Sequence, residues 1–271
     1  MEKTLSVTTF NSLNNPDRKE ERIEVLFQEI KEHDSDVVLL QEVLQDTFPL
    51  LKNKALEDGW HISEGVRVVH GPVKIYGNVT LSRTPVASQF SLPSFLPHEK
   101  QQIESLVTHL DNNVTVINAH LMWGSANELH RLDAAYNINQ YAECLKDQEP
   151  ERLIVLGGDL NATFTSSAMR YLNGDLPYKN SSTFWTNAWD MAETVFPTAR
   201  KEGGWAEITA TGVGITRPEQ MPDRTIDYIF TYGWNFGKKH CPLDLKKFGE
   251  SNLSNGFGLS DHYGITTKIS L

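Results

Sequence analysis

Polar side chains end several apolar runs of this sequence at places where a strand needs no such residue. Gln41 and Glu42 follow four consecutive apolar residues, and a Gly-Gly-Asp-Leu-Asn sequence follows another apolar run at 157–161. A Ser-Asp-His sequence at 260–262 stands just before the last apolar stretch. Carboxylate and amide oxygens are good ligands for a hard cation such as Mg²⁺. Carboxylate-held Mg²⁺ beside histidines is typical of enzymes that hydrolyse phosphate esters.

Each of these groups has an ordinary structural interpretation when it is taken alone. A single residue such as Asn11 after a strand is a common turn residue, and His120 alone would be a hydrogen-bonded structural histidine. The conjunction of carboxylates and amides at several strand ends with a late Asp-His pair favours chemistry. The sequence has no Cys or His cluster that suits zinc, no phosphate-binding P-loop and no Gly-x-Ser-x-Gly nucleophile motif.

Seven short motifs, taken in order, resemble those of the endonuclease/exonuclease/phosphatase superfamily, the group of DNase I, exonuclease III and the neutral sphingomyelinases. The motifs are Phe10-Asn11, Leu40-Gln41-Glu42, Tyr76-Gly77-Asn78, Asn118-Ala119-His120, Gly158-Asp159-Leu160-Asn161, Arg224-Thr225-Ile226-Asp227-Tyr228 and Leu259-Ser260-Asp261-His262. Each is weak alone, but their common order and spacing are specific. The resemblance implies an α+β fold in which two mainly antiparallel sheets pack face to face with helices outside, a four-layer αββα sandwich. We expect one catalytic domain over residues 1–271.

The resemblance assigns a metal site to three of these residues. Glu42 matches the family's principal metal carboxylate, Asn11 lies where the first strand helps to hold the metal or its water, and Asp261 is a further acidic group. Family nucleases often carry an acidic residue two positions after the first Asn, where this sequence has Leu13. This departure favours one Mg²⁺ ion, or a second ion held only weakly, and Mn²⁺ could replace Mg²⁺.

The resemblance also implies catalytic and substrate-binding roles. Asp159 would align and deprotonate the attacking water, and Asn161 would donate a hydrogen bond to a phosphate oxygen. His262 would stabilise charge in the transition state, with Asp227 orienting and charging its imidazole. His120 would contact the phosphate or assist the leaving oxygen. Asn78 is a secondary candidate for substrate contact.

Hydrophobic patterns predict the elements that must position these residues. Apolar residues at helical spacing predict a helix over 17–32, and a second helix is predicted to begin near Ser125, with Glu128 completing a capping box. Strands are predicted at 4–10, 36–40, 78–82, 107–110, 114–119, 153–156, 226–231 and 263–270. The second of these strands is expected to end at Gln41-Glu42. No Gly-, Ser- or Pro-rich linker divides the chain, which favours a single domain.

Two segments show little periodicity and are interpreted as loops. The segment from Tyr178 to Arg224 is long enough to be a functional loop, and the apolar, Pro-broken segment 90–97 could touch lipid or a partner. Four tryptophans, three of them in the long segment, could stack on bases or line an apolar pocket. These are Trp123, Trp185, Trp189 and Trp205.

The charge balance limits how the chain could bind nucleic acid. The chain has 25 Lys and Arg against 35 Asp and Glu, a net charge of −10, which argues against coating nucleic acid by charge alone. Bound Mg²⁺ would offset acids gathered at one metal site, so the acidity counts only against tight, processive binding to long DNA. No apolar run is long enough to span a membrane, and stable membrane insertion is not expected.

We expect a cytoplasmic monomer without a signal peptide, with a secreted mature chain as the alternative, and with Cys144 and Cys241 reduced.

Three hypotheses for the function follow. The favoured one is a metal-dependent phosphodiesterase that acts on nucleic acid or nucleotides. The second is the same chemistry on a small or lipid phosphate, such as an inositol phosphate or sphingomyelin. The third is a catalytically inactive family member that serves as a binding module, against which the intact motif residues weigh.

Overall fold

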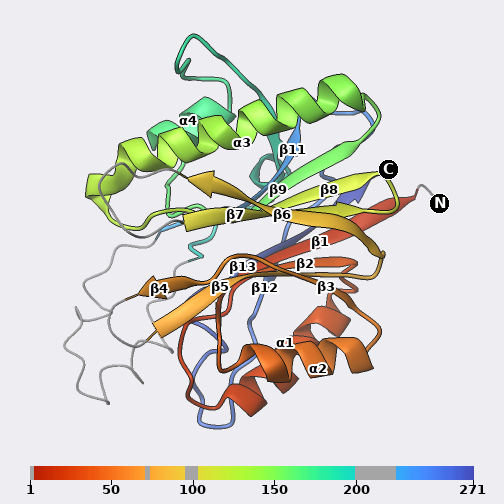
Figure 1. Cartoon of the computed structure of the whole chain (residues 1–271), viewed down its shortest axis with the longest axis vertical. Coiled ribbons are helices and arrows are strands. Elements are labelled where there is room, and N and C mark those ends of the chain that lie inside the picture. The colour runs from red at the N-terminus through yellow and green to blue at the C-terminus, as the bar shows by residue number, and fades with distance from the viewer. Residues whose placement is uncertain (1–2, 71–73, 95–102, 199–223) are drawn as a thin grey trace.

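The computed structural model describes residues 3–70, 74–94, 103–198 and 224–271. In these residues two β-sheets pack face to face, and helices lie on the outer face of each (Figure 1). The predicted four-layer αββα sandwich is therefore confirmed.

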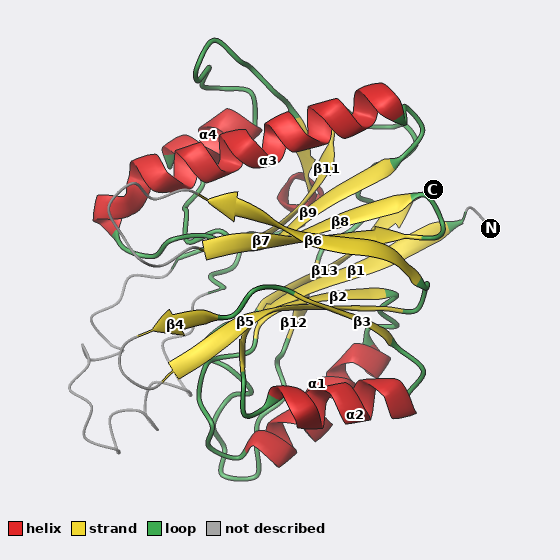
Figure 2. Ribbon diagram, in the orientation of Figure 1, coloured by secondary structure: helices red, strands yellow, loops and turns green. Residues whose placement is uncertain are grey.

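The first sheet combines strands from the first third of the chain with the two last strands. In spatial order they are β12 (Lys246–Phe248), β13 (Gly264–Ser270), β1 (Thr4–Asn11), β2 (Val37–Leu44), β5 (Lys74–Ser82) and β3 (His61–Glu64), with β4 (Val68–His70) also paired to β5. β1 and β2 run parallel, and the other neighbours in this sheet are antiparallel. Helices α1 (Lys19–Glu32) and α2 (Phe48–Glu57) cover the outer face (Figure 2).

The second sheet is built from the middle of the chain. Its order is β10 (Trp185–Asn187), β11 (Asp227–Tyr232), β9 (Leu153–Asp159), β8 (Val114–His120), β7 (Ile103–Leu110) and β6 (Val86–Ser94). β8 and β9 run parallel, whereas the remaining pairs are antiparallel. Helices α3 (Glu128–Gln148) and α4 (Ser167–Leu172) cover its outer face (Figure 2).

The two parallel pairs bring the predicted site residues to one edge of the sandwich. Asn11 at the end of β1 lies beside Gln41 of β2, and His120 at the end of β8 lies beside Asp159 of β9. Because parallel strands end on the same side of a sheet, their terminal side chains gather there. Antiparallel β11 begins at that edge, with Asp227 opposite Asp159.

The polar ends of these strands follow apolar stretches because the central strands are covered on both faces. Every residue of β8 and β9 is buried, one face against the other sheet and one against α3 or α4. Strands buried in this way read as continuous apolar runs rather than as alternating ones. The position where such a run stops is therefore where the chain leaves the core.

Three local predictions about elements were wrong. β2 does not end at Gln41-Glu42 but continues to Leu44 through a bulge. The helix expected from Ser125 begins at Glu128, after a 3-10 turn η1 (Ser125–Asn127), and it has no capping box. The Glu128 carboxylate instead accepts hydrogen bonds from the Ser167 backbone N–H and the Arg131 guanidinium.

The expected apolar loop is also partly strand, because residues 90–94 belong to β6. β6 is the edge strand of its sheet, where Pro93 needs no backbone N–H for a second neighbour. Residues 95–97 lie outside the described residues.

The long segment 178–224 contains regular structure at its start. Trp185 lies in β10 and Trp189 in the 3-10 turn η2 (Ala188–Met191), and both side chains are buried in the core. They anchor the segment to the second sheet and are not available to stack on a substrate. Trp205 and the rest of 199–223 lie outside the described residues.

Cys144 is exposed and Cys241 is buried, and both are free. Across the described part of the chain, no helix combines the length and the apolar character that a membrane span requires.

Candidate active site

Glu42 reaches the site edge because β2 bulges at this residue. Pairing with β5 passes from Leu40 opposite Val79 to Val43 opposite Gly77, so two residues of β2 face a single residue of β5. Glu42 adopts a φ of 59°, a left-handed conformation that costs free energy in a residue with a side chain. The bulge turns this carboxylate toward the end of the sandwich, where a regular strand would not place it.

The Asn14 side chain, to which the sequence analysis gave no role, holds the Glu42 carboxylate in place. Glu42 Oε2 accepts hydrogen bonds from the backbone N–H of Asn14 at 3.0 Å and from its Nδ2 at 2.6 Å. The only hint in the sequence was the Asn-Asn-Pro turn after β1, which indicates a turn and no function. Glu42 Oε1 lies 3.7 Å from His120 Nε2.

Asp159 lies at the centre of the site. Its Oδ1 accepts a hydrogen bond from the Asn161 backbone N–H at 2.9 Å, and its Oδ2 accepts one from Asn11 Nδ2 at 3.1 Å. His120 Nε2 and His262 Nε2 lie 3.6 and 3.8 Å from Oδ2. Burial raises the pKa of the Asp159 carboxyl above its ordinary value. It is therefore a stronger base than an exposed aspartate.

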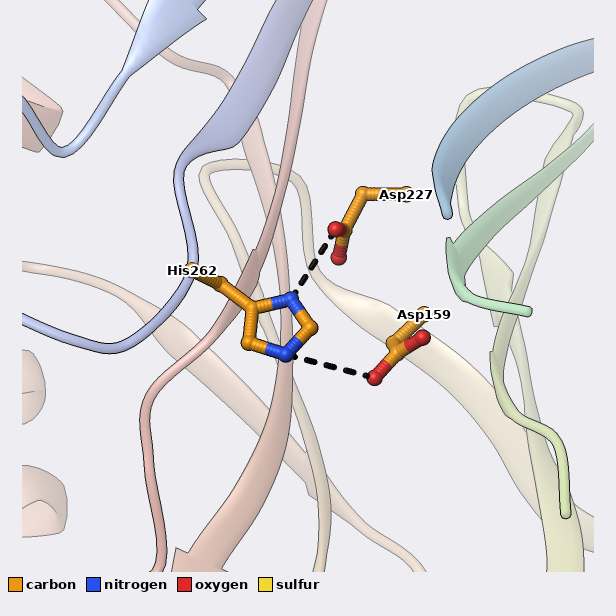
Figure 3. Close-up of side chains that lie close together, drawn as sticks. All are labelled: Asp159, Asp227 and His262. Atoms are coloured by element: carbon orange, nitrogen blue, oxygen red, sulfur yellow. Dashed lines mark hydrogen bonds and ion pairs between the residues drawn. The ribbon is translucent and has the colours of Figure 1, made fainter. Parts of the chain in front are cut away.

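His262 is held between two carboxylates (Figure 3). Its Nδ1 lies 3.0 Å from Asp227 Oδ2, and its Nε2 faces Asp159. Burial alone would lower the pKa of His262, but Asp227 and Asp159 outweigh burial and hold that pKa well above its usual value. The two carboxylates thus favour the protonated imidazole, in which one N–H is directed at Asp227 and the other into the site.

Asp227 is fully buried, and Thr198 fixes its backbone. Thr198 Oγ1 accepts hydrogen bonds from the backbone N–H groups of Ile226 and Asp227, and its carbonyl accepts one from Tyr263 N–H at 2.7 Å. This residue thus links β11 to the chain that carries His262. Asp227 Oδ1 has no hydrogen-bond partner among the described residues.

Asp261 is a buried carboxylate whose charge interacts with His262 and Glu42. Burial raises the pKa of the Asp261 carboxyl, and the neighbouring Glu42 carboxylate raises it further, although His262 acts in the opposite direction. The preceding Ser260 hydroxyl donates to the Asn11 carbonyl at 2.7 Å and so attaches this segment to β1. In the described part of the chain, no Lys or Arg forms an ion pair with Glu42, Asp159, Asp227 or Asp261.

Asn78 lies behind the site, in a buried bridge of amides between the two sheets. Its Nδ2 donates to the Asn118 carbonyl at 3.0 Å. Gln41 Nε2 donates to Asn118 Oδ1 at 2.8 Å, while Asn118 Nδ2 donates to the carbonyls of Leu40 and Val79, both at 3.0 Å. This bridge fixes the backbone on either side of the Glu42 bulge.

Tyr76 is a second residue that received no role from the sequence. Its ring lies 6.2 Å from that of His120, centroid to centroid, and burial followed by the Glu42 and Asp159 charges raises the pKa of its hydroxyl. The hydroxyl is therefore a neutral donor at the edge of the site.

The structure thus gathers eight of the nine predicted site residues at one edge, while Asn78 belongs to the amide bridge between the sheets. The eight are Asn11, Glu42, His120, Asp159, Asn161, Asp227, Asp261 and His262. Among them, Asp159, Asp227 and His262 offer ligand atoms within 4.8 Å of one another and could hold a metal ion. The alternative set is Glu42 with Asp261, since His262 Nδ1 is already bound to Asp227.

Comparison with known proteins agrees with this arrangement. Residues 8–262 match the model of the Endonuclease/Exonuclease/phosphatase family. No curated protein matches the chain.

Several solved structures share the fold. D. rerio TDP2 complexed with single strand DNA product is 17% identical, with a TM-score of 0.71 and all of both chains covered. The endonuclease/exonuclease/phosphatase from Bacteroides vulgatus has the same identity, TM-score and coverage. A humanized D. rerio TDP2 is 18% identical, with a TM-score of 0.69 and 99% of each chain covered. The chain belongs to the endonuclease/exonuclease/phosphatase family, whose three named activities all hydrolyse phosphate esters.

Proposed function

We propose that this protein is a divalent-metal-dependent phosphodiesterase that hydrolyses nucleic acid by attack of water on the phosphorus. One observation carries the proposal. Asp159, from the second sheet, lies within 4 Å of His120 and His262, and His262 is charged by Asp227. A buried base and a buried histidine of raised pKa therefore lie side by side at the edge of the sandwich, where both could act on a bound phosphate ester.

The residues of the site fit a divalent cation. Glu42 and Asp261 repel each other, and no lysine or arginine among the described residues pairs with either of them. Two neighbouring carboxylates, one buried and one partly buried, are unfavourable without a lysine or arginine partner, and a hard cation with oxygen ligands would relieve the repulsion. We assign the metal to Glu42 and Asp261, with Asn11 contributing to its environment. When bound, Mg²⁺ or Mn²⁺ would polarise the phosphate and neutralise charge that develops in the transition state.

Side chains of the protein would carry out the proton transfers and stabilise the charge that develops on the phosphate. Asp159 is fixed by Asn11 and Asn161, so its carboxylate can orient a water molecule and accept its proton. His262 directs an N–H into the site and would donate it to a non-bridging phosphate oxygen as negative charge accumulates. His120 would contact the phosphate or protonate the leaving oxygen.

Asn161 has one amide hydrogen left for a substrate. Its Nδ2 donates to the Leu121 carbonyl at 2.9 Å, which fixes the side chain. The other N–H of the amide remains to bind a phosphate oxygen, in keeping with its expected role. Asn161 also has a φ of 48°, so a β-branched residue at this position would strain the turn.

Nucleic acid is the substrate that we favour, and single-stranded DNA in particular. The support is the fold of TDP2, one structure of which holds a single strand DNA product. The net charge of −10 gives no general attraction for a polyanion. We therefore expect a short or terminal segment of a strand to be bound, and not a long duplex.

A substrate panel with added Mg²⁺ or Mn²⁺ tests this function. It contains single- and double-stranded DNA, RNA, bis-p-nitrophenyl phosphate, a phosphoinositide and sphingomyelin. We expect metal-dependent cleavage of single-stranded DNA that disappears in Asp159→Ala and in His262→Ala. Turnover of a lipid or inositol phosphate without cleavage of any nucleic acid would overturn the substrate proposal. No turnover of any ester with either metal would overturn the enzyme proposal.

A further inference from the structure

Trp123 projects from the turn that joins β8 to α3, beside the candidate active site. His120, three residues earlier, is the last residue of β8 and lies 3.6 Å from Asp159. The intervening Leu121 donates its backbone N–H to the Asp159 carbonyl at 2.9 Å and accepts a hydrogen bond from the Asn161 side chain. Three residues span at most about 10 Å, so the indole lies within one or two nucleotides of a phosphate held at His120 and Asn161.

Side-chain hydrogen bonds fix the backbone of this turn. The Arg131 guanidinium, itself buried, donates to the carbonyls of Met122 at 2.7 Å and Gly124 at 2.8 Å. Asn127 Nδ2 donates to the carbonyl of Trp123 at 2.7 Å. Three consecutive carbonyls are thus bound by side chains, so Trp123 is held in a defined position despite lying in a connection.

The indole itself contributes little to the folded core. Trp123 is 64% exposed, and no ring or cation of the described residues contacts its side chain. The other strongly exposed tryptophan, Trp234, is 59% exposed but packs on Phe184 and Phe236, with ring centroids 4.4 and 5.2 Å away. An exposed aromatic ring on a fixed backbone loses little conformational entropy when it binds a ligand. An unstacked nucleobase can therefore stack on such a ring at low entropic cost.

We propose that Trp123 is a base-stacking platform that selects strands with unpaired nucleobases. This inference rests on the proposed phosphodiesterase function and adds a specificity-determining residue to it. Stacking would also explain how an acidic chain can bind nucleic acid. Unlike phosphate neutralisation, which needs basic side chains and releases counterions, stacking releases few counterions and needs no positive charge. The bound base would be adjacent to the phosphate at His120 and Asn161.

The test compares an oligodeoxythymidylate with an abasic oligomer of the same length and charge. Steady-state cleavage with Mg²⁺ is measured for wild type, Trp123→Ala, Trp123→Phe and Trp234→Ala. The control residue Trp234 lies past the far end of β11, whose six residues span about 17 Å from Asp227 at the site edge. The two alanine variants therefore remove equally exposed indoles near to and far from the site.

Trp123→Ala is expected to raise KM for the thymidylate about 5- to 100-fold and to change kcat little. It should leave KM for the abasic oligomer unchanged, since that strand has no base to stack. Trp123→Phe should restore much of the affinity, and Trp234→Ala should behave as wild type.

Equal effects of Trp123→Ala on the two oligomers, or no effect on either, would overturn the stacking role while the phosphodiesterase function stands. If wild type cleaves neither oligomer with Mg²⁺ or Mn²⁺, the proposed function fails, and the platform fails with it.

Discussion

The charge on Asp227 is predicted to be needed for catalysis and not for the geometry of His262. Asp227→Asn is the substitution that separates the two. The asparagine carbonyl can still accept the hydrogen bond from His262 Nδ1, which now goes to Oδ2 at 3.0 Å. The new amide nitrogen would occupy the position of Oδ1, which has no partner among the described residues. The variant therefore keeps the shape of the pair and removes its charge.

The expected loss follows from the separation of the two groups. Unit charges 3.0 Å apart attract by about 5 kcal/mol at an effective dielectric constant of about 20. Part of this attraction offsets the cost of burying the two ions, so we take about 3 kcal/mol as the part lost from the transition state. That free energy corresponds to a fall in kcat of about 10²-fold. KM should change little because Asp227 does not itself contact the substrate and His262 is proposed to bind the phosphate mainly as charge accumulates in the transition state.

The assay is hydrolysis of bis-p-nitrophenyl phosphate at saturating metal, with thermal unfolding to show that each variant is folded. Asp133→Asn is the control, since Asp133 likewise pairs with a cationic side chain, its Oδ1 accepting hydrogen bonds from Lys179 at 2.7 Å and Tyr178 at 2.8 Å, but it lies on α3 away from the site. A folded Asp227→Asn enzyme with kcat within threefold of wild type would refute the reasoning.

Three further predictions concern stability, measured as the free energy of unfolding in urea. Gln41→Ala should cost about 2–4 kcal/mol, because it deletes a buried amide that donates to Thr9, Leu39 and Asn118; a cost below about 1 kcal/mol would contradict the bridging role. Gly158→Ala should prevent folding or cost more than about 3 kcal/mol, since φ is 150° and the added Cβ would lie 1.7 Å from the Ala119 carbonyl oxygen. Gly256→Ala, with φ of 85° and open space, is its control and should cost about 1 kcal/mol.

The third stability prediction concerns the pH dependence of the free energy of unfolding. Burial, with two nearby lysines, lowers the pKa of His240 to about 4, whereas an unfolded histidine titrates near about 6.5. The unfolded state therefore binds more protons between these values, and stability should fall as the pH drops from about 6.5 to about 4. The separation of these two pKa values sets an upper limit of about 3 kcal/mol on the loss. His240→Asn, which suits the φ of 71°, should remove this component from the pH dependence of unfolding; an unchanged profile would contradict it.

The central strands and the first helix could be predicted because their signals are local, whereas the strands β3, β4, β6, β10 and β12 at the sheet edges were not predicted. Apolar runs mark the central strands, and the stripe of apolar residues along α1 is periodic. Helices α2 and α4 went unpredicted because they are short, so packing against the rest of the chain decides them. The capping box at Ser125 failed because Glu128 has a more favourable partner in Ser167, which is distant in the sequence.

In the candidate site, too, local motifs could be read from the sequence but contacts between distant elements could not. The motif order supplied the candidate site residues, but not that Asn14 holds Glu42 or that Tyr76 lies beside His120. Nor could it separate Asn78, which bridges the sheets, from residues at the site edge. All of these depend on contacts between elements that lie far apart in the chain.

The sequence by itself identified the family through its ordered motifs, and the layered fold and the candidate site residues followed as what that resemblance implies; local periodicity supplied the central strands and the first helix. The tertiary structure alone decided how those residues meet. Two parallel strand pairs and a bulge at Glu42 bring the side chains to one edge, where burial and mutual charge make Asp159 a stronger base and His262 a cation. A pKa and a distance are properties of surroundings assembled from the whole chain, and no local pattern contains them.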